Sequence, residues 1–246
     1  MLKAEWYRVR KSYGILKWIF VLLGLMAFVS WYEVSQDYEG YGGLTLLLSH
    51  IVTTGNSIYM VAFLLGGCYV ASYENKLLHY DIMAGNKVSH VILSKCLTVA
   101  PLLVLFETLL AAGMTGCVGM ARGMEDVEVW WSRLALFGCI NLRVLMTTVL
   151  IMTVFKGVLG MGVIFLRFLL LDGMAMMFLA LLATEGNPLL AAIYKTMVGP
   201  QYVMLAEKEL GRMDVTFIVG AMAVEIGAWY VVSYVSHRRR WFYSRG

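Results

Sequence analysis

Long apolar runs alternate with short polar segments along this chain, and six of the runs approach the length that a membrane-spanning helix needs. Crossing about 30 Å of hydrocarbon takes roughly 20 mostly apolar residues in helical form. The pattern therefore predicts an all-α integral membrane protein with six transmembrane helices. The expected spans are residues 14–32, 51–73, 96–120, 134–155, 157–183 and 215–236.

The positions of the basic residues orient these spans, because Lys and Arg gather on the cytoplasmic side of a membrane. If the N-terminus lies inside, thirteen of the twenty Lys and Arg residues fall in inner segments and five in outer segments. We therefore expect both termini to be cytoplasmic. The first span is too long for a signal-peptide core and lacks a small-residue cleavage site, so it is expected to be retained.

Two segments on the cytoplasmic side are partly apolar although they cannot span. Residues 1–13 mix aromatic and basic side chains, which favours an interfacial helix lying along the membrane surface. Residues 74–86 carry a helical stripe that includes Leu77, Tyr80 and Met83, and the stripe ends at a Gly85-Asn86 break. A short cytoplasmic helix is expected there. A loop of this length with an apolar stripe usually has something to bind.

The segment before the last span, residues 184–214, holds two apolar stretches that are too short to cross the membrane. Backbone at membrane depth must satisfy its own hydrogen bonds, so two short re-entrant helices in the outer leaflet are expected. Gly199-Pro200 would supply the turn between them.

Composition supports one membrane domain over residues 1–246. Hydrophobic residues make up 60% and charged residues 15% of the 246 positions. Soluble domains are nearer about 45–50% and about 25%. These figures exclude a soluble enzyme, a disordered chain and a nucleic-acid-binding domain, and they make the lipid bilayer a constant partner.

Ionisable side chains at membrane depth are costly, so they are expected to face protein or water and to find partners. Matching depths favour a Glu107–Arg143 pair. Arg167 is then expected to pair with Glu225, which leaves Asp172 nearer the outer surface. Arg167 and Asp172 are five residues apart, about 140° around an α-helix, so they are not expected to share a face. The five candidates for a polar translocation path are Glu107, Arg143, Arg167, Asp172 and Glu225.

These charges have two readings, a polar path or a set of structural pairs that fix helix register. A proton relay would need a series of titrating groups. No His lies in the third to sixth expected spans, so a proton-coupled carrier is poorly supported.

Catalytic motifs are missing from the sequence. There is no Walker A phosphate-binding loop, no HExxH and no GxSxG. The four cysteines lie in apolar runs without metal-ligand spacing. We therefore expect no enzyme activity, no cofactor and no metal site in this chain itself.

The local sequence 74–96, together with the helix pattern, resembles the ABC-2-type permease family, with the type V exporter fold. Glu74 stands just after the second span, Ala84-Gly85-Asn86 at the break, Ser89-His90 at the polar pair and Lys95 at the start of the third span. His90 replaces the common Arg, and the Gly usual shortly after the Glu is missing.

The resemblance implies a permease half-transporter in a bacterial plasma membrane. A second copy or a paralogue would complete the pore, and separate ATPase subunits would bind ATP and Mg. The substrate would be amphipathic, such as an antimicrobial or toxic peptide that is exported. The residues implied as ATPase contacts on the coupling helix 74–86 are Glu74, Lys76, His79, Tyr80, Asp81, Met83 and Asn86.

Two other classes stay open at this point. A stand-alone secondary transporter or channel would work without an ATPase, but it predicts inverted repeats, and none is evident. A membrane-embedded enzyme or assembly factor is disfavoured by the missing catalytic motifs.

Overall fold

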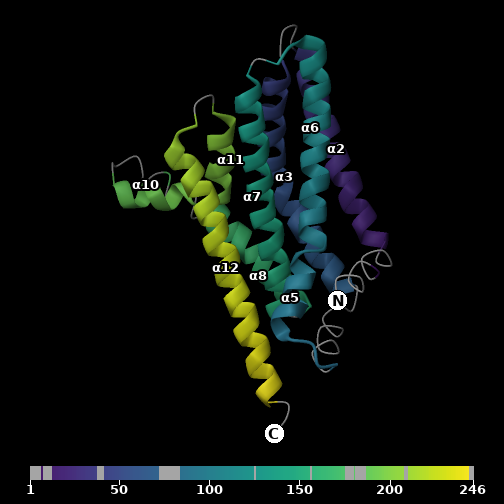
Figure 1. Ribbon diagram of the computed structural model, residues 1–246, viewed down its shortest axis with the longest axis vertical. Coiled ribbons are helices and arrows are strands. Elements are labelled where there is room, and N and C mark those ends of the chain that lie inside the picture. Colours follow the sequence, from purple (N-terminus) through teal and green to yellow (C-terminus); the bar gives the residue numbers. More distant parts are fainter. Residues whose placement is uncertain are drawn as a thin grey trace.

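The computed structural model is all-helical throughout its described part, which contains no strand (Figure 1). The residues that the structure describes are Tyr7, 13–37, 42–71, 84–124, 126–155, 157–174, Ala180, 187–207 and 210–243. The expected interfacial helix 1–13 therefore lies almost wholly outside the described residues. Most of the coupling helix 74–86 does too, except for Ala84, Gly85 and Asn86.

The helices follow one another in the order in which the apolar runs occur. They are α2 (Tyr13–Asp37), α3 (Gly43–Ala71), α5 (Val88–Cys96), α6 (Val99–Arg122), α7 (Val127–Val154), α8 (Val158–Leu166), the π-helix η1 (Arg167–Met174), α10 (Pro188–Lys195), α11 (Val198–Ala206) and α12 (Arg212–Tyr243).

The long helices α2, α3, α6 and α7 alternate in direction, and α12 runs parallel to α7 (Figure 1). In Figure 1, α2 rises from the lower end of the bundle, α3 descends, α5 and α6 rise, α7 descends, and α12 descends from the upper end. Specific contacts agree with this: His50 meets Glu107 and Gly43 meets Gly119, so α3 and α6 are antiparallel. The start of α2 and the end of α12 consequently lie at the same end of the bundle.

The membrane character that the sequence predicts is confirmed in coarse form. Within the described residues, three helices are long and apolar enough to cross a membrane: Val88–Arg122, Val127–Val154 and Arg212–Arg238. A fourth is added if α3 counts as one span, since it bends by 51° between Gly43–Gly55 and Ser57–Cys68. Apolar helices of 10–17 residues, Lys17–Tyr32 and Val158–Leu170, accompany them.

Three expected boundaries are wrong. The second apolar helix begins at Gly43 rather than at residue 51, because uncharged residues 43–50 continue the helix. The fourth begins at Val127 rather than at 134, because Asp126 caps it by accepting from the amides of Glu128 and Val129, each at 3.1 Å. The third begins at Val99 rather than at 96, because an unexpected break at Leu97–Thr98 separates α5 from α6.

The short segments show one further correction and one agreement. Two short helices are present within 184–214 as expected, but the turn between them falls at Thr196-Met197, and Gly199-Pro200 lie in the first turn of α11. Proline fits there because the first amides of a helix have no intrahelical partner. The break at Gly85 is confirmed: its φ of 87° favours glycine, and α5 starts three residues later at Val88.

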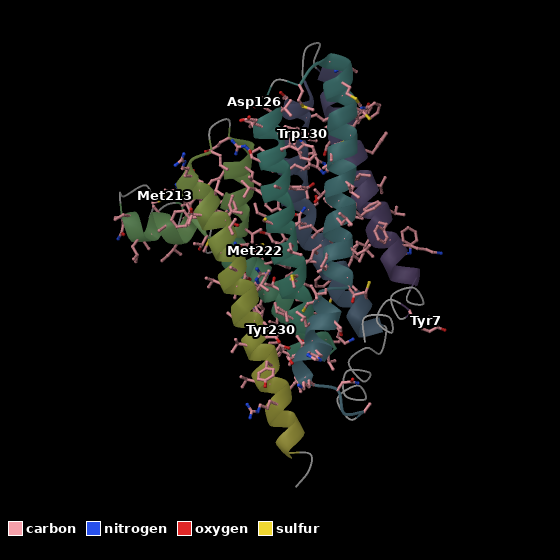
Figure 2. The ribbon with its side chains drawn as sticks, in the orientation of Figure 1. Tyr7, Asp126, Trp130, Met213, Met222 and Tyr230 are labelled. Atoms are coloured by element: carbon pink, nitrogen blue, oxygen red, sulfur yellow. The ribbon has the colours of Figure 1, made fainter. Side chains whose placement is uncertain are left out.

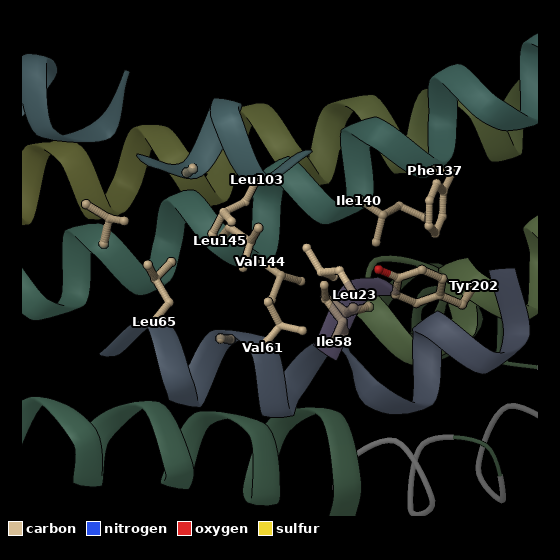
Figure 3. Close-up of a cluster of buried hydrophobic side chains, with 14 of the residues drawn as sticks. Leu23, Ile58, Val61, Leu65, Leu103, Phe137, Ile140, Val144, Leu145 and Tyr202 are labelled. Atoms are coloured by element: carbon tan, nitrogen blue, oxygen red, sulfur yellow. The ribbon is translucent and has the colours of Figure 1, made fainter. Parts of the chain in front are cut away.

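Helix α7 is the centre of the bundle, and it packs against α3, α6 and α12 (Figure 1). Its buried face includes Ile140 and Val144, which lie opposite Ile58 and Val61 of α3, and Phe137, which lies beside Tyr202 (Figure 3). Figure 2 places Asp126 and Trp130 at the upper end of α7, far from Tyr230 on the lower half of α12. The Trp130 indole donates to Thr115 of α6 over 2.9 Å, which ties the two helices together near that end.

Helix α11 packs into the bend of α3 through a close contact between Gly55 and Tyr202. A Cβ added at Gly55 would lie 2.7 Å from the Tyr202 ring. The ring also packs against Phe137 at a centroid distance of 6.3 Å, and the Tyr202 hydroxyl donates to Asn141 of α7. Because Gly55 has no side chain, the Tyr202 ring of α11 has room to pack against α3 at this point.

We expect Gly55→Ala to displace the Tyr202 ring and to destabilise the fold by about 1–3 kcal/mol, the usual cost of overpacking. Gly67→Ala is the matched control, since a Cβ at Gly67 of the same helix meets nothing within 4 Å. The measurement is the temperature at which detergent-purified protein loses its monodisperse elution peak. Equal midpoints for the two variants would contradict the seating of α11 against Gly55.

Candidate functional site: the buried ion cluster and its cavity

Two arginines from different helices converge on one carboxylate inside the bundle. Arg143 of α7 donates from Nε to Glu225 Oε2 of α12 over 2.5 Å, and Arg167 at the start of η1 pairs with Glu225 Oε1. The side chains are 9%, 7% and 19% exposed for Arg143, Arg167 and Glu225, respectively. This ion cluster therefore joins α7, η1 and α12 out of water.

Helix α11 and its preceding turn complete the surroundings of Arg143. Its Nη1 donates to Thr196 O over 2.7 Å and to Gln201 Oε1 over 2.9 Å. The amide nitrogen of Gln201 in turn donates to Lys195 O over 3.2 Å and to Phe217 O over 3.4 Å. The α10–α11 turn is thus bonded to both α7 and α12 through two side chains.

The other end of α11 is held by Arg133 of α7. Its guanidinium donates to Met204 O over 3.1 Å and to Glu207 O over 2.6 Å. The first carbonyl lies in the last turn of α11 and the second on the residue that follows the helix, where a cation also complements the helix dipole. The short helix is consequently fixed at both ends and, through Tyr202, in the middle.

The π-helical geometry of η1 changes the relation between Arg167 and Asp172. A π-helix bonds residue i to residue i+5 and is wound more loosely than an α-helix, so residues five apart lie closer together around its axis than they would in an α-helix. Both side chains are 8% exposed and both line the same cavity, which overturns the expectation that they do not share a face. Asp172 Oδ1 accepts from the Val198 amide at the start of α11 over 3.4 Å, so this carboxylate is buried against α11.

A cavity of about 840 Å³ lies between α8, η1 and α12 next to the ion cluster. Arg143, Arg167, Asp172 and Glu225 contribute its polar part. Its volume falls within the range of about 300–1,000 Å³ that is typical of small-molecule sites. The apolar side chains that line most of it are Val163, Leu166, Leu170, Phe217, Val224 and Trp229.

A second buried polar group joins α2, α3 and α6. His50 Nε2 lies 3.0 Å from Glu107 Oε1, and His50 Nδ1 lies 3.1 Å from Ser30 Oγ. Thr54 Oγ1 is 3.4 Å from the same Glu107 oxygen. His50 is fully buried and Glu107 is 2% exposed, so this pair has no access to water.

The hydrogen bonds of Ser30 determine how many protons the pair of His50 and Glu107 shares. Ser30 donates its hydroxyl proton to Met26 O over 2.9 Å, so it accepts from His50 Nδ1–H. The contact between Nε2 and Oε1 then requires one proton, on either atom. In both forms the pair is neutral as a whole, which makes its burial in an apolar bundle tolerable.

The structure therefore brings together four of the five expected intramembrane residues and separates the fifth. The Arg167–Glu225 pair is confirmed. The expected Glu107–Arg143 pair is wrong, because Arg143 is paired with Glu225 and Glu107 is paired with His50. Asp172 lines the cavity beside the ion cluster, whereas the sequence placed it apart from the pairs, nearer the outer surface.

Sequence reasoning missed His50 and Gln201. His50 falls just before the expected start of the second span at residue 51, although the stretch from Gly40 to Tyr73 contains no charged residue and indicates an earlier start. Gln201 had no comparable signal, because a neutral amide in a short apolar helix does not stand out. In the described part of the chain, no three His, Cys, Asp or Glu side chains gather as a metal ion would need.

The chain matches no protein-family model, no curated protein and no solved structure. The resemblance to ABC-2-type permeases therefore rests on residues 74–96 and the helix pattern alone.

Proposed function

We propose that this chain is the membrane-spanning permease subunit of an ATP-driven ABC exporter in a bacterial plasma membrane. It would span the membrane six times and carry an amphipathic substrate, such as an antimicrobial or toxic peptide, out of the cell by alternating access. The residues 74–96 motif and the alternating helix directions support this proposal.

The observation that carries the proposal furthest is the pair of short helices α10 and α11 between η1 and α12. Neither is long enough to span, and α11 buries Val198, Gln201, Tyr202 and Leu205 against the bundle. Short helices that enter a membrane bundle and return are what the re-entrant outer segment of this family would require. A plain extracellular loop would not bury an uncharged helix in this way.

The distribution of charge supports cytoplasmic termini. At the end where α2 begins and α12 finishes, the described residues include Lys17, Lys87, Lys95 and Arg238 and no acidic side chain. At the opposite end, Arg122 and Arg212 are accompanied by Asp126 and Glu128. The excess of basic residues at the first end fits the cytoplasmic side.

The same geometry suggests how helices move together. Arg143, Gln201 and Glu225 bond α7, α11 and α12 into one unit, so α12 and the α10–α11 pair would shift with α7. In the proposed mechanism, ATP-driven closure of two ATPase subunits pushes on segment 74–86, which leads through the Gly85 turn into α5. A second copy or a paralogue would face the exposed apolar side of α12 and close the pore.

The test is affinity purification of the full chain from cells that also express its neighbouring genes, in mild detergent. An ATP-binding subunit with ATPase activity is expected to co-elute at equal stoichiometry. Replacing Tyr80 and Asp81 together by Ala should reduce its recovery by about tenfold while insertion is unchanged, because these residues lie on the implied coupling helix. Glu128→Ala is the matched control, since this exposed side chain lies at the opposite end of the bundle.

Two results would contradict the proposal. Elution of the chain alone would favour a stand-alone transporter or channel, in which the ion cluster becomes the first site to test. If the variant with Ala at positions 80 and 81 recovered as much ATPase as the unchanged chain, the assignment of residues 74–86 as the coupling helix would be wrong.

A further inference from the structure

The cavity beside the ion cluster contains two buried polar atoms that the protein leaves without partners. Arg167 Nη1 and Asp172 Oδ2 each have no hydrogen bond. The other halves of both side chains are anchored, Arg167 to Glu225 and Asp172 to the Val198 amide. A buried polar group without a partner usually costs about 1–3 kcal/mol, so a matched pair of such groups in one cavity calls for an explanation.

The two atoms are complementary in type. Arg167 Nη1 is a donor only, and an ionised Asp172 Oδ2 is an acceptor only. A ligand group that satisfies both must present one acceptor and one donor side by side. A peptide bond does so, because each backbone unit carries one C=O and one N–H.

We propose that this cavity binds an apolar peptide segment of the exported substrate, with one peptide carbonyl accepting from Arg167 Nη1 and a peptide N–H donating to Asp172 Oδ2. The inference rests on the proposed export function and names the substrate chemistry of that site. The apolar lining, which includes Leu166, Leu170 and Val224, would receive the side chains.

The depth of the cluster favours a peptide over a lipid. Arg143 and Glu225 lie near the middle of the expected spans 134–155 and 215–236. A phospholipid keeps its polar head group at the membrane surface, outside the hydrocarbon core. A peptide has polar groups along its whole length, so it can present one at mid-depth while its side chains stay in apolar surroundings.

Tyr59 of α3 is the one competing partner to be tested. Its buried hydroxyl makes no hydrogen bond of normal geometry, yet it lies close enough to Asp172 to interact with that carboxylate as a weak hydrogen-bond donor. If Tyr59 served as the partner of Asp172, no ligand would be needed. Tyr59→Phe removes this hydroxyl and keeps the ring that packs on Phe168 at a centroid distance of 4.5 Å.

The experiment measures binding of a capped trileucine peptide to the full purified chain in lipid nanodiscs, without any ATPase. Trp229 lines the cavity, so binding is read as the part of the tryptophan fluorescence change that disappears in Trp229→Phe. We expect saturable binding that weakens at least about tenfold in Asp172→Asn, because an amide turned by the Val198 bond presents NH₂ instead of an acceptor. Tyr59→Phe should bind as the unchanged protein does.

A comparison of ligands keeps the test independent of how the variants fold. The same trileucine peptide methylated on its backbone nitrogens keeps its apolar side chains but has no N–H, and it should bind the unchanged protein at least about tenfold more weakly. Equal binding of the two peptides would overturn the proposal. Saturable binding of a single-chain aminophospholipid in place of the peptide would overturn it too, as would a loss in Tyr59→Phe equal to that in Asp172→Asn.

Failure of this inference can be separated from failure of the export proposal. If the chain binds the peptide but never co-purifies with an ATPase, the peptide site stands and the ABC export proposal fails. Recovery of an active ATPase by a chain that binds no peptide would do the reverse.

Discussion

Glu225→Gln is expected to destabilise the protein by about 3–5 kcal/mol, the cost of removing one partner from a buried ion pair. The substitution would leave the guanidinium groups of Arg143 and Arg167 beside a single remaining carboxylate, Asp172. Both guanidiniums are less than a tenth exposed, so most of their surface would stay unsolvated after the carboxylate charge is lost. The loss should be visible as a lower thermal midpoint of the detergent-purified chain.

Two comparisons make this result specific. Glu128→Gln changes the same residue type at an exposed position of α7 and should change the free energy of unfolding by no more than about 0.5 kcal/mol, so the midpoint should hardly move. In double-mutant cycles, Arg143→Met should couple to Glu225→Gln and should be additive with Glu107→Gln, because residues without shared partners add. Coupling between Arg143 and Glu107 would restore the pair that the structure rejects.

The second large effect is expected at Glu107, where the nature of the replacement decides the outcome. Glu107→Ala leaves the His50 Nε2 atom buried without a partner and should cost about 1–3 kcal/mol, with a further loss from the emptied space. Glu107→Gln should cost far less. Its NH₂ group can donate to Nε2 while Nδ1–H stays bonded to Ser30, and the site remains neutral.

The measurement is again the thermal midpoint, with Leu109→Ala as the control. Leu109 lies on the same helix and is 62% exposed, so its truncation should have little effect if it faces lipid. If Glu107→Gln lowers the midpoint as much as Glu107→Ala does, a full negative charge is needed beside His50. The pair would then be an ion pair that depends on the glutamate charge and not on one shared proton.

The class of fold could be predicted because it depends on local properties of the chain. An apolar run of the right length inserts as a helix whatever its neighbours are, which is why α6, α7 and α12 appear where the hydrophobic pattern indicates. Their ends were less predictable. Asp126 starts α7 a full seven residues before the expected point, because a capping side chain can carry a helix beyond the hydrocarbon.

The site was only partly predictable, for a different reason. The rule that intramembrane charges need partners identified Arg143, Arg167, Asp172 and Glu225, and it paired Arg167 with Glu225 correctly. Depth matching was the second argument, and it paired Glu107 with Arg143. It failed for Glu107, because depth along the membrane normal says nothing about which side of the bundle a helix face points to. His50 at a similar depth on α3 was the nearer partner.

The sequence by itself determined that this is a helical membrane protein with a polar turn at Gly85, two short helices before the last span and a few costly charges in apolar helices. The length of an apolar run, the backbone conformation of a glycine and the free-energy cost of burying a charge each depend on a single segment of the chain. Only the tertiary structure decided which charges meet. The π-helical turn that brings Arg167 and Asp172 to one cavity, the packing of Tyr202 against Gly55 and the joining of α7, η1 and α12 at Glu225 all depend on how helices rotate and pack. No periodicity of a single segment encodes that.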